Sequence, residues 1–338
     1  MREWPMREWL IERGIGEIRA ALIDHGQIVA AEIEADEDGA RAGSVHAARL
    51  TRITVPDRRA IVTLEGGQAA LIEPVPRGVS EGGRLMVEVH RAALPEPGRA
   101  KLAIGRVAAD GAESSPGLDL VARVEASGDA VRLGSTYDAD ELEAAGWSEI
   151  IEEARTGHVD FDGGALRLSV TPAMMLIDVD GWLPLADLAI AGASAAASMI
   201  LRHGITGSIG IDLPTAGSKA ARLAAAEAID AILPQPFERT AVNGFGFLQI
   251  VRRRTAASIP ERVQGDPVGV AARSLLRRAE RTPGAGTRTL TAAASVIARL
   301  EARADWRDEL VRRIGAPIAL RVNNALAISA GHVDAQNP

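Results

Sequence analysis

The feature that most constrains the fold of this sequence is an alternation of apolar runs and Ala-rich segments between residues 173 and 252. The apolar runs are short and continuous, which is typical of strands buried on both faces. The segments between them are long enough for helices. The predicted order is strand 173–179 (AMMLIDV), helix 184–202, strand 208–212 (SIGID), helix 217–233 and strand 244–251 (GFGFLQIV). This alternation predicts an α/β layer, in which ligands bind at the carboxyl ends of the strands.

Aspartates end the first two of these strands. Asp178 and Asp180 lie in LIDVDG, and Asp212 lies in IGIDLPT. Asp178 and Asp180 fall on one side of an extended chain, and Asp178 faces Asp212 at the sheet edge if the two strands are neighbours. Paired carboxylates attract Mg²⁺, which takes one or two of them together with waters and a substrate phosphate. A strand-ending aspartate is also commonly a helix N-cap or a turn residue, so spacing alone leaves that alternative open.

Upstream of this layer, short strand-like runs separated by Gly, Pro and Asp extend from Ser44 to about Leu102. So many short strands in one stretch predict a small closed barrel, for which the OB-fold is the common solution. The remaining predicted elements are a hairpin at 17–35, barrel strands at 60–64, 69–72 and 85–89, a helix at 141–155, strands at 158–161 and 165–170, helices at 268–280 and 290–313, and closing strands at 317–322 and 325–329.

Composition narrows the functional classes. The 338 residues include no cysteine, which excludes disulfides, thiol catalysis and Cys-ligated zinc and fits a cytoplasmic protein. No apolar stretch has the length of a membrane span, and the first ten residues do not form a signal peptide. The net charge of −7 argues mildly against a nucleic-acid binder, although the segments 252–254 and 273–281 are locally basic. Such runs are more often solvated faces.

Three segments resemble the RNase E/G family of bacterial endoribonucleases. TPAMMLIDVDG resembles the family's Ile-Asp-Ile-Asn-Ser segment, and SIGIDLPT resembles its Ile-Val-Ile-Asp-Phe segment. NGFGFLQIVRRR resembles the family's Arg-Phe-Gly-Leu-Leu-Glu-Met-Ser-Arg segment. Their order and rough spacing agree with the family. The resemblance extends over nearly the whole chain but is specific only from about residue 158 to 255.

The resemblance implies a mixed α+β and α/β fold. Its expected parts are an RNase H-like scaffold (1–43 and 135–170), an inserted OB-type RNA-binding barrel (44–103), a reduced sensor or connector (104–134), a DNase I-like catalytic α/β subdomain (171–262) and a small α+β C-terminal domain (266–335).

The resemblance also implies Mg²⁺-dependent hydrolysis of single-stranded RNA, in RNA decay or in processing such as that of rRNA, with a 5′-phosphate left on the downstream product. Asp178 and Asp212 match the family's magnesium ligands. Asp180 falls where the family has an asparagine that supports the attacked phosphate. An aspartate there weakens substrate binding or supplies a third metal ligand, and we favour the ligand.

Six cationic side chains are candidates for phosphate contacts, although each is also explained as an ordinary surface charge. They are Arg49, Arg52 and Lys101 around the barrel, Lys219 and Arg222 on the helix after Asp212, and Arg252, which matches a family arginine. The barrel's stacking aromatics are replaced by Ile61 and Leu71, which predicts weaker RNA binding because stacking contributes about 1–3 kcal/mol per base.

The sequence departs from the family elsewhere. The zinc-link cysteines are absent near Gln264-Gly265-Asp266, which excludes a zinc-linked tetramer and leaves another homodimer open. The family's 5′-sensing Arg-Thr pair corresponds to Arg123-Val124, so we expect 5′-end sensing to be weak or lost. The segment between the aspartates is shorter and less polar. We expect structural roles for His46, His158, His203 and Asn243.

Two alternatives therefore stay open beside the nuclease. One is an RNA-binding or assembly factor of the same fold with weak or no catalysis. The other is a metal-dependent hydrolase of a different phosphodiester.

Overall fold

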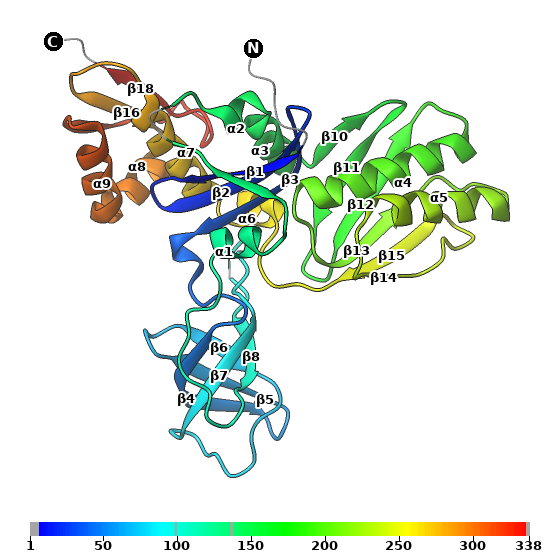
Figure 1. The fold of residues 1–338 in the computed structure, drawn as a ribbon, viewed down its shortest axis with the longest axis horizontal. Helices are drawn as coiled ribbons and strands as arrows, with labels where there is room; N and C mark the ends of the chain where they lie inside the picture. Colours follow the sequence, from blue (N-terminus) through cyan, green and yellow to red (C-terminus); the bar gives the residue numbers. More distant parts are fainter. Residues whose placement is uncertain (1–6, 99, 136–137, 336–338) are drawn as a thin grey trace.

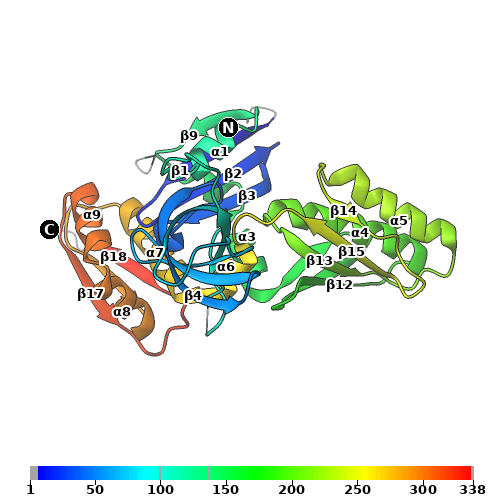
Figure 2. The ribbon, with the colours of Figure 1, turned by 90° about the horizontal axis from the view of Figure 1, so that it is seen from below.

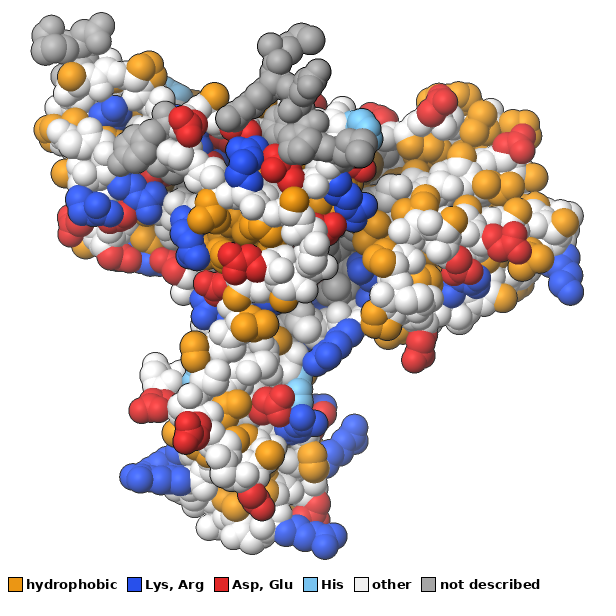
Figure 3. Space-filling model, in the orientation of Figure 1, with side chains coloured by type: hydrophobic (Ala, Val, Ile, Leu, Met, Phe, Trp, Pro, Cys, Tyr) orange, Lys and Arg blue, Asp and Glu red, His pale blue; other side chains and the backbone are white. Residues whose placement is uncertain are grey.

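The computed structural model describes residues 7–98, 100–135 and 138–335, which form a central scaffold with three units attached to it (Figure 1). A barrel extends from the scaffold in one direction. An α/β unit and a C-terminal unit lie on opposite sides of it, as the view in Figure 2 also shows. The barrel and the α/β unit stand apart at an open angle (Figure 3). The predicted absence of a signal peptide falls partly on residues 1–6, which lie outside the described residues.

The scaffold contains a four-stranded sheet in the order β3-β2-β1-β9. Its strands are β1 (Glu8–Arg13), β2 (Glu17–Asp24), β3 (Gln27–Ala35) and β9 (Ala130–Leu133). The predicted hairpin is confirmed as β2 and β3, joined through His25 and Gly26 at positive φ. The sequence pattern did not reveal β1 because it buries two acids. Glu8 pairs with Arg132 and Glu12 with Arg19.

Helices cover both faces of the scaffold sheet. The helix α1 (Leu120–Glu125) packs on one face, and α2 (Glu141–Ala144), α3 (Trp147–Thr156) and α6 (Ile259–Gly265) pack on the other. The single helix predicted at 141–155 is wrong in one respect, because Gly146 at φ 101° separates α2 from α3. The predicted connector 104–134 is also more structured than expected, since α1 and β9 belong to the scaffold.

The predicted closed barrel is confirmed, with five strands in the order β4-β5-β6-β8-β7. They are β4 (Val45–Val55), β5 (Arg59–Leu64), β6 (Ala69–Ile72), β7 (Arg84–Arg91) and β8 (Ala103–Val107). Alternate residues of each strand point inward and form its core, among them Leu50, Val62 and Val87. The strand β8 closes the barrel by pairing with both β6 and β7, so the barrel extends past its predicted end at residue 103.

The α/β unit is a six-stranded sheet in the order β10-β11-β12-β13-β15-β14. Its elements are β10 (His158–Phe161), β11 (Gly164–Val170), β12 (Met175–Gly181), α4 (Leu185–Arg202), β13 (Gly207–Asp212), α5 (Lys219–Ile232), β14 (Glu238–Arg239) and β15 (Phe247–Arg252). The predicted alternation of strands and helices is confirmed. The predicted boundary at 170 is wrong, because β11 pairs with β12 along its whole length. The end predicted at 262 is also wrong, because Ile259 and Val263 of α6 join the scaffold core.

Both helices of the α/β unit cover the same face of its sheet (Figures 1 and 2). Within the described part of the chain, α4 is the one helix that is long and apolar enough to cross a membrane by length and composition. Its Ala189, Ala193 and Ala197 are buried against the sheet. These residues thus form part of the core of the α/β unit.

The C-terminal unit combines helices with a three-stranded sheet in the order β17-β16-β18. Its elements are α7 (Pro267–Arg281), β16 (Arg288–Ala292), α8 (Ala294–Ala302), α9 (Ala304–Ile314), β17 (Ile318–Val322) and β18 (His332–Ala335). The helix predicted at 290–313 is wrong over its first residues, where the fully buried β16 lies. The strand predicted at 325–329 is wrong as well. That segment is a largely exposed turn, and β18 pairs with β16 instead.

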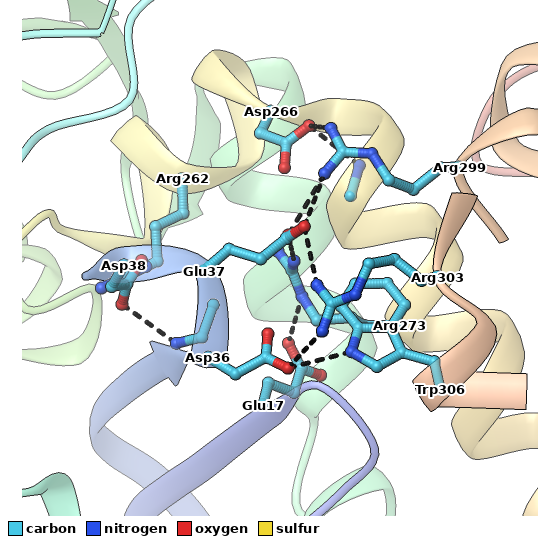
Figure 4. Close-up of polar contacts among 12 residues, drawn as sticks. Glu17, Asp36, Glu37, Asp38, Arg262, Asp266, Arg273, Arg299, Arg303 and Trp306 are labelled. Atoms are coloured by element: carbon cyan, nitrogen blue, oxygen red, sulfur yellow. Dashed lines mark hydrogen bonds and ion pairs between the residues drawn. The ribbon is translucent and has the colours of Figure 1, made fainter. Parts of the chain in front are cut away.

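A network of ion pairs joins the segment between the scaffold sheet and the barrel to α6 and to the C-terminal unit (Figure 4). The acids of the short 3-10 helix η1 (Asp36–Asp38), which leads from β3 toward the barrel, are its centre. Glu37 binds Arg273 and Arg299, and Asp38 binds Arg262 at 2.6 Å. Asp36 accepts from Arg303 and from the indole of Trp306 at 2.9 Å. We call this set the junction network, with Glu17 and Asp266 as its outer acids.

Candidate active site

The structure brings Asp178 and Asp212 together. The strands β12 and β13 are parallel neighbours, and Asp178 is the register partner of Asp212. Register partners on adjacent strands project from the same face of a sheet about 4.8 Å apart. The residues before them, Ile177 and Ile211, are buried under the helices, whereas both aspartates are exposed on the other face. The predicted neighbour relation is confirmed.

The face of the sheet away from α4 and α5, which we call the open face, carries the acids. Asp180 lies on it two residues beyond Asp178 and is also exposed. Burial, followed by the nearby charges of Asp180 and Asp212, raises the pKa of Asp178 above its usual value, and Arg167 acts in the opposite direction. The acids thus repel one another, and a bound cation would relieve that repulsion.

The chemistry of these donors fits Mg²⁺. Within residues 7–98, 100–135 and 138–335, no three or more His, Asp or Glu side chains gather into a ligand set for a metal ion. Asp180 therefore shares the open face without forming a three-ligand set with Asp178 and Asp212. Two carboxylates suffice for Mg²⁺, which keeps several waters and takes further oxygens from a phosphate.

Arg167 is a site residue that the sequence interpretation missed. It lies on β11 as the register partner of Asp178, on the open face. The side chain is exposed and makes no ion pair or hydrogen bond with the described residues. The alternation in GALRLSV and the tight turn at Thr171–Met174 carry the signal, because counting back from that turn aligns Arg167 with Asp178.

An aromatic ring lies beside the acids. Phe247 is the register partner of Asp212 on β15, and it is half-buried. Its ring leans over Gly210, where an added Cβ would be 2.6 Å from the Phe247 Cζ atom. Glycine at 210 therefore allows the ring to lie against the open face, next to the carboxylates.

Two of the predicted phosphate contacts, Arg49 and Arg52, are exposed on the barrel and have no ion-pair partner among the described residues. Arg49 is the register partner of Arg84 on β7, which is also exposed and without such a partner. Like charges directly opposite each other destabilise a strand pair, and a polyanion would relieve this. Figure 3 shows Lys and Arg side chains projecting from the sides and far end of the barrel.

Two other predicted contacts have structural partners instead. Lys101 binds Glu96 and the carbonyl of Pro172, so it ties the barrel root to the β11–β12 turn. Arg252 donates to the carbonyl of Ile205 at 2.8 Å. It follows the buried Leu248 and Ile250 at every second position of β15 and therefore lies on the same, helix-covered side of the sheet, away from the aspartates. The predicted RNA roles of Lys101 and Arg252 conflict with these positions.

The last two predicted contacts lie at the start of α5. Lys219 is exposed, and its role stays a prediction. Arg222 donates weakly to the carbonyl of Ala216 at 3.4 Å. In the barrel, Ile61 and Leu71 are cross-strand register partners and are half-buried. They form an aliphatic patch where the resemblance would place aromatics.

The other singled-out side chains have structural partners. Arg123 pairs with Glu32 and Glu34, and Asp266 caps α7 and pairs with Arg299. The three histidines bind side chains away from the aspartates. These contacts are His203 to Glu153, His158 to Asp160 and His46 to Ser44. The turn role of Asn243 is confirmed, since its side chain accepts from the amides of Phe245 and Phe247.

Compared with known proteins, the chain matches no family model and no curated protein. The resemblance to RNase E/G rests on the three segments quoted above.

Proposed function

We propose that this protein is an RNase E/G-like endoribonuclease that hydrolyses single-stranded RNA with Mg²⁺. The observation that supports this most is the register pairing of Asp178 and Asp212 on an exposed sheet face. A purely structural aspartate at a strand end caps a helix or a turn. Neither does so here, since α4 begins after Pro184 and Ser218 caps α5.

Asp178 and Asp212 would hold the magnesium ion. When bound, the ion would stabilise charge on the phosphate and supply an activated water. Arg167, the register partner of Asp178 on the neighbouring strand β11, binds a phosphate oxygen through its guanidinium. Asp180 adds to the negative potential that draws the cation to this face.

The rest of the chain then has the roles that the resemblance implies. The barrel is an OB-type module that binds the RNA backbone through Arg49, Arg52 and Arg84. The central sheet is an RNase H-like scaffold, and the α/β unit is a DNase I-like catalytic layer. We place the protein in the cytoplasm, without zinc and open to forming a homodimer.

A second candidate is an RNA-binding or assembly factor without efficient catalysis. The acidic character of the open face favours it, since Asp180 offers a phosphate no amide donor.

The test is cleavage of an unstructured, 5′-labelled RNA with Mg²⁺ or with EDTA by the wild type, Asp178→Asn and Asp212→Asn. The matched control is Asp187→Asn, an exposed aspartate on α4. We expect internal cleavage that needs Mg²⁺ and that falls at least about a hundredfold in either site variant, because the ion contributes several kcal/mol. The control should keep full activity.

Cleavage that persists in EDTA, or that is equal in the site variants and the control, would contradict the proposal. RNA binding without cleavage would favour the second candidate. Cleavage of 5′-monophosphate and 5′-hydroxyl RNA at equal rates would confirm the predicted loss of 5′-end sensing.

A further inference from the structure

Among the described residues, the two most exposed aromatic side chains lie at one edge of the α/β sheet. The chain has only four Phe, five Trp and one Tyr. Among the described large hydrophobic side chains, Phe245 is 84% exposed and Trp182 is 79% exposed, more than any other. The other described tryptophans, Trp9, Trp147 and Trp306, are buried. Large apolar groups held in water at one place mark a binding surface.

The two aromatic residues flank the end of the strand that carries Asp212. Trp182 directly follows β12, and Phe245 lies just before β15. Both strands pair with β13, which ends at Asp212. The strands that the two aromatics adjoin, β12 and β15, are therefore two strand spacings apart, about 10 Å. The half-buried Phe247, two residues after Phe245, is the register partner of Asp212.

Both residues are held on tight backbone turns. The Trp182 amide donates to the carbonyl of Gly163 at 3.2 Å, and Gly181 lies so close to Gly163 that an added Cβ would be 2.4 Å from its oxygen. The carbonyl of Phe245 accepts from the Thr215 hydroxyl at 3.2 Å. The φ of 96° at Gly246 and the side chain of Asn243 fix the rest of that turn. Their exposure is thus built into the fold.

Such side chains suit nucleobases. Every base has a π-face, so an aromatic side chain stacks on it without regard to sequence. We propose that Trp182 and Phe245 stack on bases of a single-stranded nucleic acid, on either side of the nucleotide whose phosphate meets Asp178 and Asp212. This rests on the proposed function and names the contacts that hold its substrate. The barrel surface offers the aliphatic side chains of Ile61 and Leu71 in place of aromatic rings. We therefore place base stacking at the edge of the α/β sheet where β13 ends at Asp212.

A protein partner would use the same edge differently. Leu185, three residues after Trp182, is 60% exposed. An apolar protein interface, including one between two copies of this chain, would bury Leu185 together with the aromatics. A stacked base needs only the rings. Leu185 therefore serves as the matched control.

The first experiment measures the fluorescence of Trp182 in a Trp4→Phe background, because Trp4 lies outside the described residues and the remaining tryptophans are buried. Oligoadenylate should quench this emission and protect it from acrylamide. An abasic oligonucleotide of the same length and inorganic polyphosphate should do neither. Equal quenching by the abasic strand would overturn stacking, as would emission that changes only with protein concentration.

The second experiment measures oligoadenylate affinity by anisotropy in Mg²⁺-free buffer, where no cleavage occurs in the proposed mechanism. Trp182→Ala and Phe245→Ala should each weaken binding about 5- to 150-fold, which corresponds to 1–3 kcal/mol per stacked base. Trp182→Phe should keep most of the affinity, and Leu185→Ala should change it little. Equal losses in Leu185→Ala and Trp182→Ala would overturn the proposal in favour of an apolar protein contact.

These readouts separate the two proposals. Base-dependent quenching without any cleavage would leave the stacking surface standing and remove the nuclease. Mg²⁺-dependent cleavage that is unaffected by Trp182→Ala and Phe245→Ala would do the reverse.

Discussion

Among the described residues, charged side chains are paired with opposite charges in the junction network and are left without ion-pair partners on the open face. In the junction network, Arg273 is 4% exposed and binds both Glu17 and Glu37 (Figure 4). On the open face, Asp178, Asp212 and Arg167 are exposed and lack ion-pair partners within the described chain. Charges that are paired inside the protein stabilise its architecture. Charges that are left in register without partners are available to an ion or a ligand.

The largest expected effect lies in the junction network. Arg273→Met would leave Glu17 and Glu37 partly buried with fewer counter-charges, and breaking a buried ion pair costs about 3–5 kcal/mol. We expect a fall of this size in the free energy of unfolding measured in urea. Arg321→Met, at an exposed arginine on β17, should change it by less than about 0.5 kcal/mol. Similar small changes in both variants would show that the network contributes little.

A smaller effect is expected at Arg167, where the change should affect the reaction and leave the fold intact. A hydrogen bond to a charged group contributes about 1.5–3 kcal/mol, so Arg167→Gln should slow RNA cleavage about 10- to 100-fold. Arg167→Lys should recover part of the rate, and the melting temperature should stay unchanged in both. An unchanged rate in Arg167→Gln would place the phosphate elsewhere on the open face.

The barrel also carries charged side chains without ion-pair partners, because Arg49 and Arg84 are register partners and neither binds an acid among the described residues. Arg49→Gln and Arg84→Gln should each lower RNA affinity by a few-fold. Each lost phosphate contact should also reduce the slope of log affinity against log salt by about 0.7. Arg106→Gln is the control, since Arg106 already pairs with Glu88. An equal change of slope in all three variants would indicate diffuse attraction without specific contacts.

The comparison also shows what the sequence could predict. Asp178 and Asp212 were predictable because parallel neighbouring strands end at one sheet edge, and apolar runs mark those strands. Arg167 was missed because its position depends on the register of β11 against β12, which a single turn sets. Lys101 and Arg252 were misplaced because composition does not reveal a carbonyl partner far along the chain.

The junction network could not be predicted from the sequence either. Its ion pairs join residues that are far apart in the chain, such as Asp38 and Arg262. The arginines at 273–281 looked like a solvated basic run, yet Arg273, Arg277 and Arg281 bind acids of the scaffold. The same pairing hid β1, whose buried glutamates break the apolar pattern of a strand. Ion pairs between distant elements override local patterns in this fold.

The smallest expected effect concerns the stability of the open face and tests the metal site without any measurement of activity. Mg²⁺ at several times its dissociation constant should stabilise the wild type by about 1 kcal/mol, because it binds the folded state selectively. That corresponds to a rise of about 2 °C in melting temperature. In Asp178→Asn the repulsion from Asp180 and Asp212 is removed, so the metal-free protein should melt at the same or a slightly higher temperature. The added ion should then have no effect on it. Asp187→Asn should respond to Mg²⁺ as the wild type does. If Asp178→Asn responds equally, the ion binds elsewhere, and the unpaired acids of the open face do not form its site.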